Sequence, residues 1–168
     1  DLLNMGQSSL AVRWNIRNGF FVQDLFVVEC EVLQDVMAVV SEGHRNRRIG
    51  SHELNKDSSR SHSILTVHLE SETIDPDDGH PLVKFGKIVF VDLAGSERLK
   101  DTRSEGMTLT ETGAINRSLF TLSKVISALA DAAKKKKPKK NNFVPYRDSK
   151  LTKLLMDSLG GTSMTLMI

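Results

Sequence analysis

The chain has 168 residues, of which 39% are hydrophobic and 26% charged, a composition typical of a folded domain rather than of a disordered chain. Its net charge of +2 identifies no partner, and no apolar run approaches the ~20 residues that a membrane span needs. The single cysteine, Cys30, excludes an internal disulfide and a Cys-x-x-Cys zinc site. No secretory pattern opens the chain, so a reducing cytosolic setting fits.

The first elements in chain order are two strands and a helix. Residues 10–14 and 19–22 are predicted as a strand pair joined by a turn, and residues 25–28 as a short strand or extension. Valines and leucines recur at helical spacing over 31–42. Gly43 predicts the end of that helix because glycine readily adopts the left-handed conformation that stops one.

The middle of the chain is predicted as a loop followed by a hairpin. Residues 44–61 are polar and basic, which favours a loop. Apolar and polar residues alternate over 65–69, as in a half-buried strand, and residues 75–79 are typical of a turn. The return strand at 88–91 is apolar on both faces, which predicts a central strand covered on both sides.

Two helices are predicted in the last third. A loop over 98–110 leads to the first helix, whose apolar stripe is formed by Ile115, Leu119, Leu122, Val125, Ile126 and Leu129. Asp148 or Ser149 caps the second helix, and Gly160 predicts its end. Strands mixed with helices indicate an α/β layered sheet.

Two segments carry residue types suited to nucleotide chemistry. The first, N-K-D-S-S-R-S-H at 55–62, is a polar loop with two adjacent hydroxyls, a guanidinium and an imidazole. The second, V-D-L-A-G-S-E-R at 91–98, is an apolar strand that ends on Asp92 and turns through Gly95. A carboxylate at the carboxyl end of a buried strand is where nucleotide-hydrolysing sheets hold Mg²⁺ and its waters. Gly95 has no side chain, so its amide can approach a γ-phosphate closely.

These two segments resemble the nucleotide-sensing switches of the kinesin motor domain. The resemblance continues in order, at the family's spacing, through N-R-S-L at 116–119, V-P-Y-R-D-S-K-L-T at 144–152 and D-S-L-G-G at 157–161. It implies a P-loop NTPase-like α/β fold, a central mixed sheet with helices on both faces, of which residues 1–168 are a part. It also implies a parent protein that is a microtubule-stimulated ATPase, binds ATP and Mg²⁺, and drives microtubule-based movement in the cytoplasm, on the cytoskeleton.

The resemblance implies a role for four residues around the metal and the phosphates. Ser59 would ligate Mg²⁺, and Asp92 would hold it through water. Ser58 would contact the γ-phosphate, since a hydroxyl binds phosphate and a hard cation without adding charge. Gly95 would sense the γ-phosphate and change conformation when it leaves.

Further residues of the two segments would complete the site. Arg60 and Glu97 correspond to the family's switch-to-switch ion pair, which would close the site around the nucleotide. Asn55 is expected to position the attacking water. His62 is expected to be a structural histidine rather than a catalytic one.

Six lysines fall within the seven residues 134–140. On charge alone this run is equally a nuclear-localisation patch, a nucleic-acid or lipid contact, or a solvated loop. By the resemblance, the connecting loop at this place faces the microtubule, and lysines there would attract the acidic tails of tubulin over a Debye length of about 8 Å. We therefore expect tubulin as the partner, no nucleic acid and no membrane span. The expected microtubule contacts are Arg98, Lys100, Arg103, Lys134, Lys135, Lys136, Lys137, Lys139, Lys140, Tyr146, Arg147, Lys150 and Lys153.

A phosphate-binding loop of the pattern G-x-x-x-x-G-K-[ST] does not occur in these residues. The only Gly-Lys pair is Gly86-Lys87, with Pro81 in place of the first glycine and Ile88 in place of the hydroxyl. Compared with the family, the chain is expected to start after the phosphate-loop half and to stop inside a late core strand. The isolated fragment is therefore expected to be inactive. The alternatives are a non-motor microtubule-binding protein that has lost hydrolysis and, disfavoured for want of an Asn-Lys-x-Asp motif, a GTPase-like switch.

Overall fold

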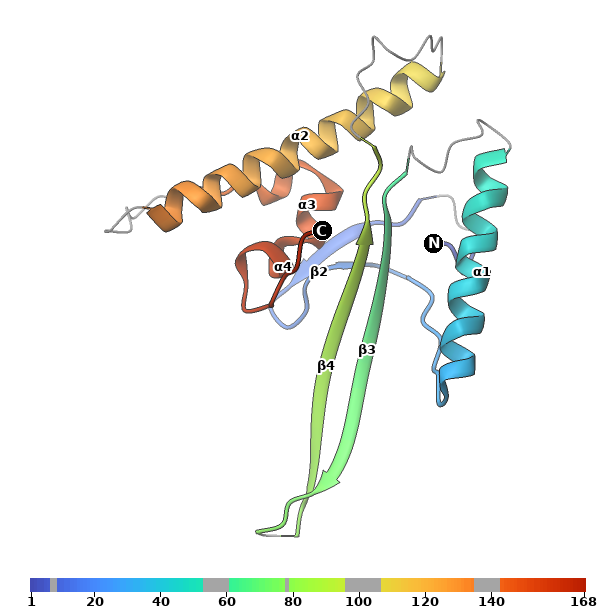
Figure 1. Ribbon diagram of the computed structural model, residues 1–168, viewed down its shortest axis with the longest axis vertical. Coiled ribbons are helices and arrows are strands. Elements are labelled where there is room, and N and C mark those ends of the chain that lie inside the picture. Colours follow the sequence, from blue (N-terminus) through green and yellow to red (C-terminus); the bar gives the residue numbers. More distant parts are fainter. Residues whose placement is uncertain (7–8, 53–60, 78, 96–106, 135–142) are drawn as a thin grey trace. The chain divides into compact units, whose positions relative to one another are not determined.

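The computed structural model describes the chain in six stretches, residues 1–6, 9–52, 61–77, 79–95, 107–134 and 143–168 (Figure 1). They divide into two compact units. The main unit comprises Asp1–Ser58 and Ser96–Ile168, and the hairpin unit comprises Ser59–Gly95.

The main unit opens with the predicted strand pair. β1 (Val12–Asn15) and β2 (Gly19–Val22) pair antiparallel along their whole length. Val12 lies opposite Val22, and Asn15 lies opposite Gly19. Gly19 has a φ of +64°, a left-handed conformation that a residue with a side chain rarely adopts, so the glycine permits the turn. Residues 25–28 form no strand, and the alternative of a plain extension is the correct one.

α1 (Leu33–His52) is longer than its sequence pattern predicts. The helix passes through Gly43, so the predicted end there was wrong, and residues 44–52 are helical rather than looped. A glycine inside a helix costs roughly 0.5–1 kcal/mol relative to alanine, which neighbouring contacts can offset. Such contacts flank this glycine.

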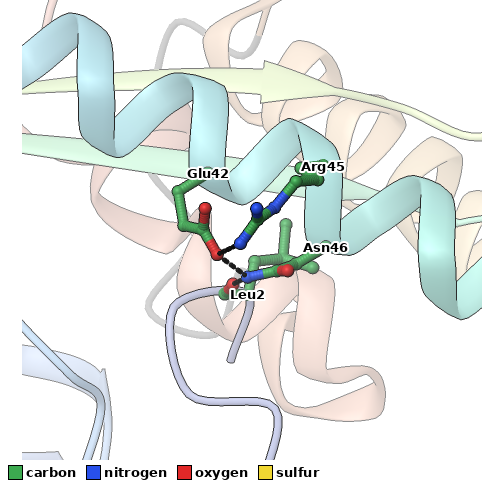
Figure 2. A network of polar contacts seen from close by, with 4 residues as sticks. All are labelled: Leu2, Glu42, Arg45 and Asn46. Carbon is green, nitrogen blue, oxygen red and sulfur yellow. Dashed lines mark hydrogen bonds and ion pairs between the residues drawn. The ribbon is translucent and has the colours of Figure 1, made fainter.

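A polar network joins α1 to the start of the chain (Figure 2). The Glu42 carboxylate accepts hydrogen bonds at Oε1 from Arg45, at 2.7 Å, and from the Asn46 amide, at 3.0 Å. The same Asn46 nitrogen donates to the carbonyl oxygen of Leu2, 2.8 Å away. The hydrogen bond from the Arg45 guanidinium, and then that from the Asn46 amide, hold the pKa of Glu42 below its ordinary value. Side-chain hydrogen bonds between Glu42 and residues one turn further along thus span Gly43, and Asn46 also binds the N-terminal segment.

The rest of the main unit is a helical cluster. α2 (Met107–Lys134) packs against the 3-10 helix η2 (Tyr146–Asp148) and the short helix α3 (Lys150–Leu154), and α3 also contacts β1 and β2. A break at Leu155 separates α3 from α4 (Met156–Gly160), whereas the sequence predicted a single helix over this stretch.

The core of the main unit lies where α2 meets α3. Its buried residues are Thr121, Leu122, Val125, Leu151, Thr152 and Leu155, and Val125 and Thr152 have no exposed surface. Leu122 and Val125, at the centre of the predicted apolar stripe of α2, therefore face the core. The two threonines are satisfied, since Thr121 donates to the Arg117 carbonyl oxygen at 2.9 Å and Thr152 to that of Tyr146 at 2.8 Å.

The hairpin unit consists of β3 (Ser63–Ile74) and β4 (Pro81–Asp92), twelve residues each. They pair antiparallel along their whole length, from Ser63 opposite Asp92 to Ile74 opposite Pro81. The predicted turn between them is confirmed, and Gly79 adopts a φ of +72° there. Its amide donates to the Asp75 carbonyl oxygen at 2.9 Å, which closes the turn.

β4 is a strand as predicted, but it is not covered on both faces. Phe85, Ile88 and Phe90 expose 78%, 45% and 57% of their surface. Two strands alone cannot bury both of their faces, so a β-rich apolar run in a hairpin leaves apolar side chains in solvent. The prediction of a central, buried strand was therefore wrong for the residues described.

Residues 163–168, which the resemblance assigned to a late core strand, are irregular and exposed. Among the described helices, none combines the length and apolar character that crossing a bilayer requires.

Candidate functional site

The predicted site residues divide into those that the structure describes and those that it does not. Asp92, Gly95, Lys134, Tyr146, Arg147, Lys150 and Lys153 are described. The predictions for Asn55, Ser58, Ser59, Arg60, Glu97, Arg98, Lys100, Arg103, Lys135, Lys136, Lys137, Lys139 and Lys140 fall outside the described residues.

Asp92 is the last residue of β4, as the predicted carboxylate at a strand end requires. Its partner across the hairpin is Ser63, the first residue of β3. The chain then leaves the ladder through Leu93, Ala94 and Gly95 without further strand structure. Asp92 and Gly95 therefore follow each other, three residues apart in sequence, at one end of the hairpin. His62, the residue directly before β3, belongs to the same end.

Among the described residues of the hairpin unit, Ala94 alone is buried, with 5% of its surface exposed. Its backbone N–H donates to Nδ1 of His62, at 3.0 Å. A buried amide without a partner costs about 1–3 kcal/mol, so this imidazole satisfies a group that the strand ladder no longer reaches. The bond ties the chain just before β3 to the chain just after β4.

The electrostatic setting of His62 suits its role as an acceptor. Burial lowers the pKa of His62 below its ordinary value, and the nearby negative charge of Asp92 partly opposes that shift. The neutral imidazole therefore prevails at pH 7. Since Nδ1 accepts, the ring proton of that neutral form is on Nε2.

Sequence reasoning named His62 as structural but did not find its partner. The alternation of apolar and polar residues does not predict which residues of the two strands pair. The imidazole lies beside residues 93–95 because Ser63 pairs with Asp92. The signal available in the sequence is a histidine directly before one strand, together with an Asp that ends the other strand and is followed by Leu-Ala-Gly.

A second polar cluster holds the turn around Tyr146. Ser149 caps α3, as predicted, because its Oγ accepts from the Thr152 amide at 3.0 Å. The Thr152 hydroxyl in turn lies 2.8 Å from the Tyr146 carbonyl oxygen. Burial raises the pKa of the Tyr146 phenol above its ordinary value. This network fixes the turn that carries Arg147 and leads into α3.

The described basic residues of the predicted track contact lie on the main unit. Lys134, Arg147 and Lys150 are exposed, and Lys153 is half-buried. The Lys150 ammonium also donates to the Leu10 carbonyl oxygen, at 3.4 Å. Exposed cations attract acidic surfaces, and salt screens that attraction.

The donor set around Asp92 suits a bound nucleotide with Mg²⁺ better than a metal held by protein alone. Among the described residues, no cluster of three or more histidine, cysteine, aspartate or glutamate side chains could hold a metal ion. Mg²⁺ is typically held by one or two carboxylates, waters and substrate phosphates, and Asp92 is a single carboxylate of that type at the end of β4.

Comparison with known proteins shows the family. The kinesin motor domain model matches residues 1–168, so the chain belongs to the kinesin motor domain family. It is 47% identical over 173 residues to kinesin-like protein KIF12 of Mus musculus and 42% identical over 168 residues to kinesin-like protein KIN-12D of Arabidopsis thaliana. The alignments cover all of the chain but only 26% and 6% of those relatives.

Solved structures confirm the fold. The chain matches a fast kinesin with a TM-score of 0.73 at 38% identity, over 90% of this chain and 40% of that one. It matches KIF14, solved as a dimer with AMP-PNP in complex with a microtubule, with a TM-score of 0.78 at 37% identity, over 92% of this chain and 42% of that one. The expected kinesin motor fold is thereby confirmed, and the chain spans less than half of each matched motor structure.

Proposed function

We propose that the chain is part of an ATP-driven microtubule motor. The observation that carries the proposal is the end of the hairpin unit, where β4 ends on Asp92 and the chain continues through Leu93 and Ala94 to Gly95. Membership of the kinesin motor domain family supports it, as does the match to a KIF14 structure that contains AMP-PNP and a microtubule. We propose cytoplasmic microtubules as its location.

On the nucleotide side, each residue has a distinct task. Asp92 would hold Mg²⁺ through water and Ser59 would ligate it, while Ser58 would contact the γ-phosphate. The bound metal would neutralise charge that develops on the phosphates during hydrolysis. Gly95 offers a backbone amide with no side chain in front of it, so the amide can follow the γ-phosphate and withdraw when it leaves.

Three residues would assemble the site for hydrolysis. Arg60 and Glu97 would form an ion pair that closes it, and Asn55 would orient the attacking water. An ion pair that is partly removed from water is stable only with good geometry, so a few hydrogen bonds to phosphate can decide whether it forms. Positioning and electrostatic stabilisation would then supply most of the catalysis.

On the microtubule side, the exposed cations of the main unit would meet the acidic surface of tubulin. Arg147 and Lys150 lie on the turn and helix that Ser149 and Thr152 hold in place, so part-buried hydrogen bonds hold the backbone that carries them. The lysine run at 134–140 would add a long-range attraction rather than a fitted contact, because its charge is concentrated in seven residues.

The test is ATP turnover by the full-length protein that contains this chain, with and without microtubules, beside the 168-residue chain alone. We expect stimulated turnover from the full-length protein. We expect none from the 168 residues, because they contain no G-x-x-x-x-G-K-[ST] loop. A full-length protein that binds microtubules but does not hydrolyse ATP would replace the proposal with the non-motor alternative.

A further inference from the structure

We propose that His62 is a positioning residue for nucleotide hydrolysis, which anchors the turn at 93–95 through the Ala94 amide and thereby makes Gly95 the point where that turn moves. The inference rests on the proposed function and goes beyond it, since it assigns a role in hydrolysis to a side chain that the proposed function leaves without one.

The first support is the place of the bond in the hairpin. The ladder between β3 and β4 ends with Ser63 opposite Asp92. One residue before Ser63 and two residues after Asp92, the imidazole and the Ala94 amide meet at 3.0 Å. The side chain of His62 thus extends the pairing past the last strand residues, into the segment that carries the proposed phosphate sensor.

The second support is burial. Most residues of the hairpin unit are exposed, whereas Ala94 keeps only 5% of its surface accessible. A buried amide that loses its acceptor cannot recover the hydrogen bond from water. Ala94 is therefore held at a fixed place, while Gly95, its neighbour, is half-buried and free of a side chain. A fixed residue followed by a glycine is the arrangement of a hinge.

The third support is what the bond connects. His62 follows Ser59 by three residues, and Ala94 lies between Asp92 and Gly95. The bond thus joins one described residue from each of the two sequence segments that are proposed to contact the metal and the γ-phosphate. A shift of about 1 Å in such groups is enough to cost about 100-fold in rate, so a bond that fixes their spacing is expected to affect the chemical step more than nucleotide binding.

The experiment compares three variants of the full-length protein. His62→Ala removes the acceptor. His62→Asn keeps one, because the asparagine Oδ1 is attached at the same place along the side chain as the histidine Nδ1. His68→Ala is the matched control, since His68 lies six residues further along, on β3, and its side chain is exposed. Hydrogen exchange of the peptide that contains Ala94 measures the bond directly, and ATP turnover measures its consequence.

We expect the Ala94 amide to exchange about 5- to 100-fold faster in His62→Ala than in the wild type, and His62→Asn to restore most of the protection. The kcat for ATP should fall by about 10-fold or more in His62→Ala with KM changed less than about 3-fold, and should recover in His62→Asn. His68→Ala should match the wild type in both measurements.

Unchanged exchange in His62→Ala overturns the anchor, whatever the turnover does. Faster exchange with unchanged kcat overturns the positioning role, and so does a kcat loss that His62→Asn does not recover at all. A wild type that binds microtubules without hydrolysing ATP refutes the proposed function instead. In that case the positioning role falls with it, and the exchange data still decide whether the anchor exists.

Discussion

Gly160 lies at the end of α4, against the ring of Tyr146, and the substitution Gly160→Ala tests how tightly that corner is packed. An alanine Cβ there would lie 1.9 Å from the Tyr146 Oη, 3.2 Å from its Cζ and 3.4 Å from the Cδ2 of Leu129. The phenol oxygen would have to retreat by about 1.1 Å to reach even a 3.0 Å contact. Tyr146 is half-buried, and Thr152 binds its carbonyl oxygen, so the backbone that carries the ring is held in place.

The expected result is a loss of stability. Overpacking of this kind costs about 1–3 kcal/mol, whereas alanine in a helix gains roughly 0.5–1 kcal/mol over glycine. The net change is a loss of about 1–2 kcal/mol, which lowers the ratio of folded to unfolded protein by about 5- to 30-fold. Urea unfolding followed by circular dichroism measures this as a lower midpoint at an unchanged slope.

The double variant Gly160→Ala/Tyr146→Phe identifies the cause. Phenylalanine removes only the oxygen that the new methyl group would meet, so the nearest remaining contact is the ring carbon at 3.2 Å. We expect the pair to recover most of the loss, with a coupling energy of about 1 kcal/mol between the two sites. If Gly160→Ala is neutral or stabilising, or if Tyr146→Phe recovers nothing, the contact with the phenol oxygen does not limit this position.

Three further perturbations address the pH dependence, the proposed ion pair and the lysine run. Tyr146 is the only tyrosine of the chain, so the ultraviolet absorbance of tyrosinate reports its ionisation, and we expect a midpoint above 10 that moves back toward 10 in Gly160→Ala. The pKa of the Tyr146 phenol is higher in the folded than in the unfolded chain, so the contribution of the neutral phenol to stability is complete below about pH 10 and is lost as the pH rises through the pKa of the folded state. A titration midpoint at or below 10 contradicts the burial of this phenol. Glu97→Ala and Arg60→Ala should each slow hydrolysis by roughly two orders of magnitude while nucleotide binding persists, and the double variant should be no worse than the worse single one, whereas additive losses would show that the two are not partners. Replacing the lysines of 134–140 with serine should lower microtubule affinity and flatten its salt dependence with little change in turnover at saturating microtubules; full affinity with a full salt response would mean that the run is not a track contact.

The sequence predicts best the elements whose causes are local. The turn at Gly19, the turn at Gly79 and the Ser149 cap were all predicted, because each depends on the conformational freedom or the side-chain oxygen of one residue. The apolar stripe of α2 was predicted as well, since a 3.6-residue period over many turns is hard to imitate by chance. Its central residues Leu122 and Val125 are buried.

The errors arise where contacts distant in sequence decide the outcome. Gly43 indicated a helix end, but a tie between Asn46 and the Leu2 carbonyl, 44 residues apart, accompanies a helix that continues to His52. The strands of the hairpin are longer than the alternating pattern at 65–69 indicated, because cross-strand hydrogen bonds extend the pairing over residues whose polar side chains carry no pattern.

The candidate site shows the same division. The position of Asp92 at a strand end follows from one apolar run and was predicted. The partner of His62 depends on the register of two strands and on where their ladder stops, which no single segment encodes. Resemblance to a family supplied the roles of Ser59, Arg60 and Glu97, which remain predictions because those residues fall outside the described part of the chain.

The β3–β4 hairpin has a consequence for how the protein is made. Its strands are joined by a turn of six residues, so the pair can close within about 1–10 μs of leaving the ribosome. The partner of α2 in the main core, Leu155, is synthesised 63 residues after Asp92, and at 5–20 residues per second that takes roughly 3–13 s. The closed hairpin displays side chains such as Phe85 and Phe90 in solvent throughout that interval, as it does in the described structure. We therefore expect chaperones that recognise exposed apolar strands to engage residues 63–92 during translation, and production at low temperature, which slows association of such strands, to raise the yield of soluble protein.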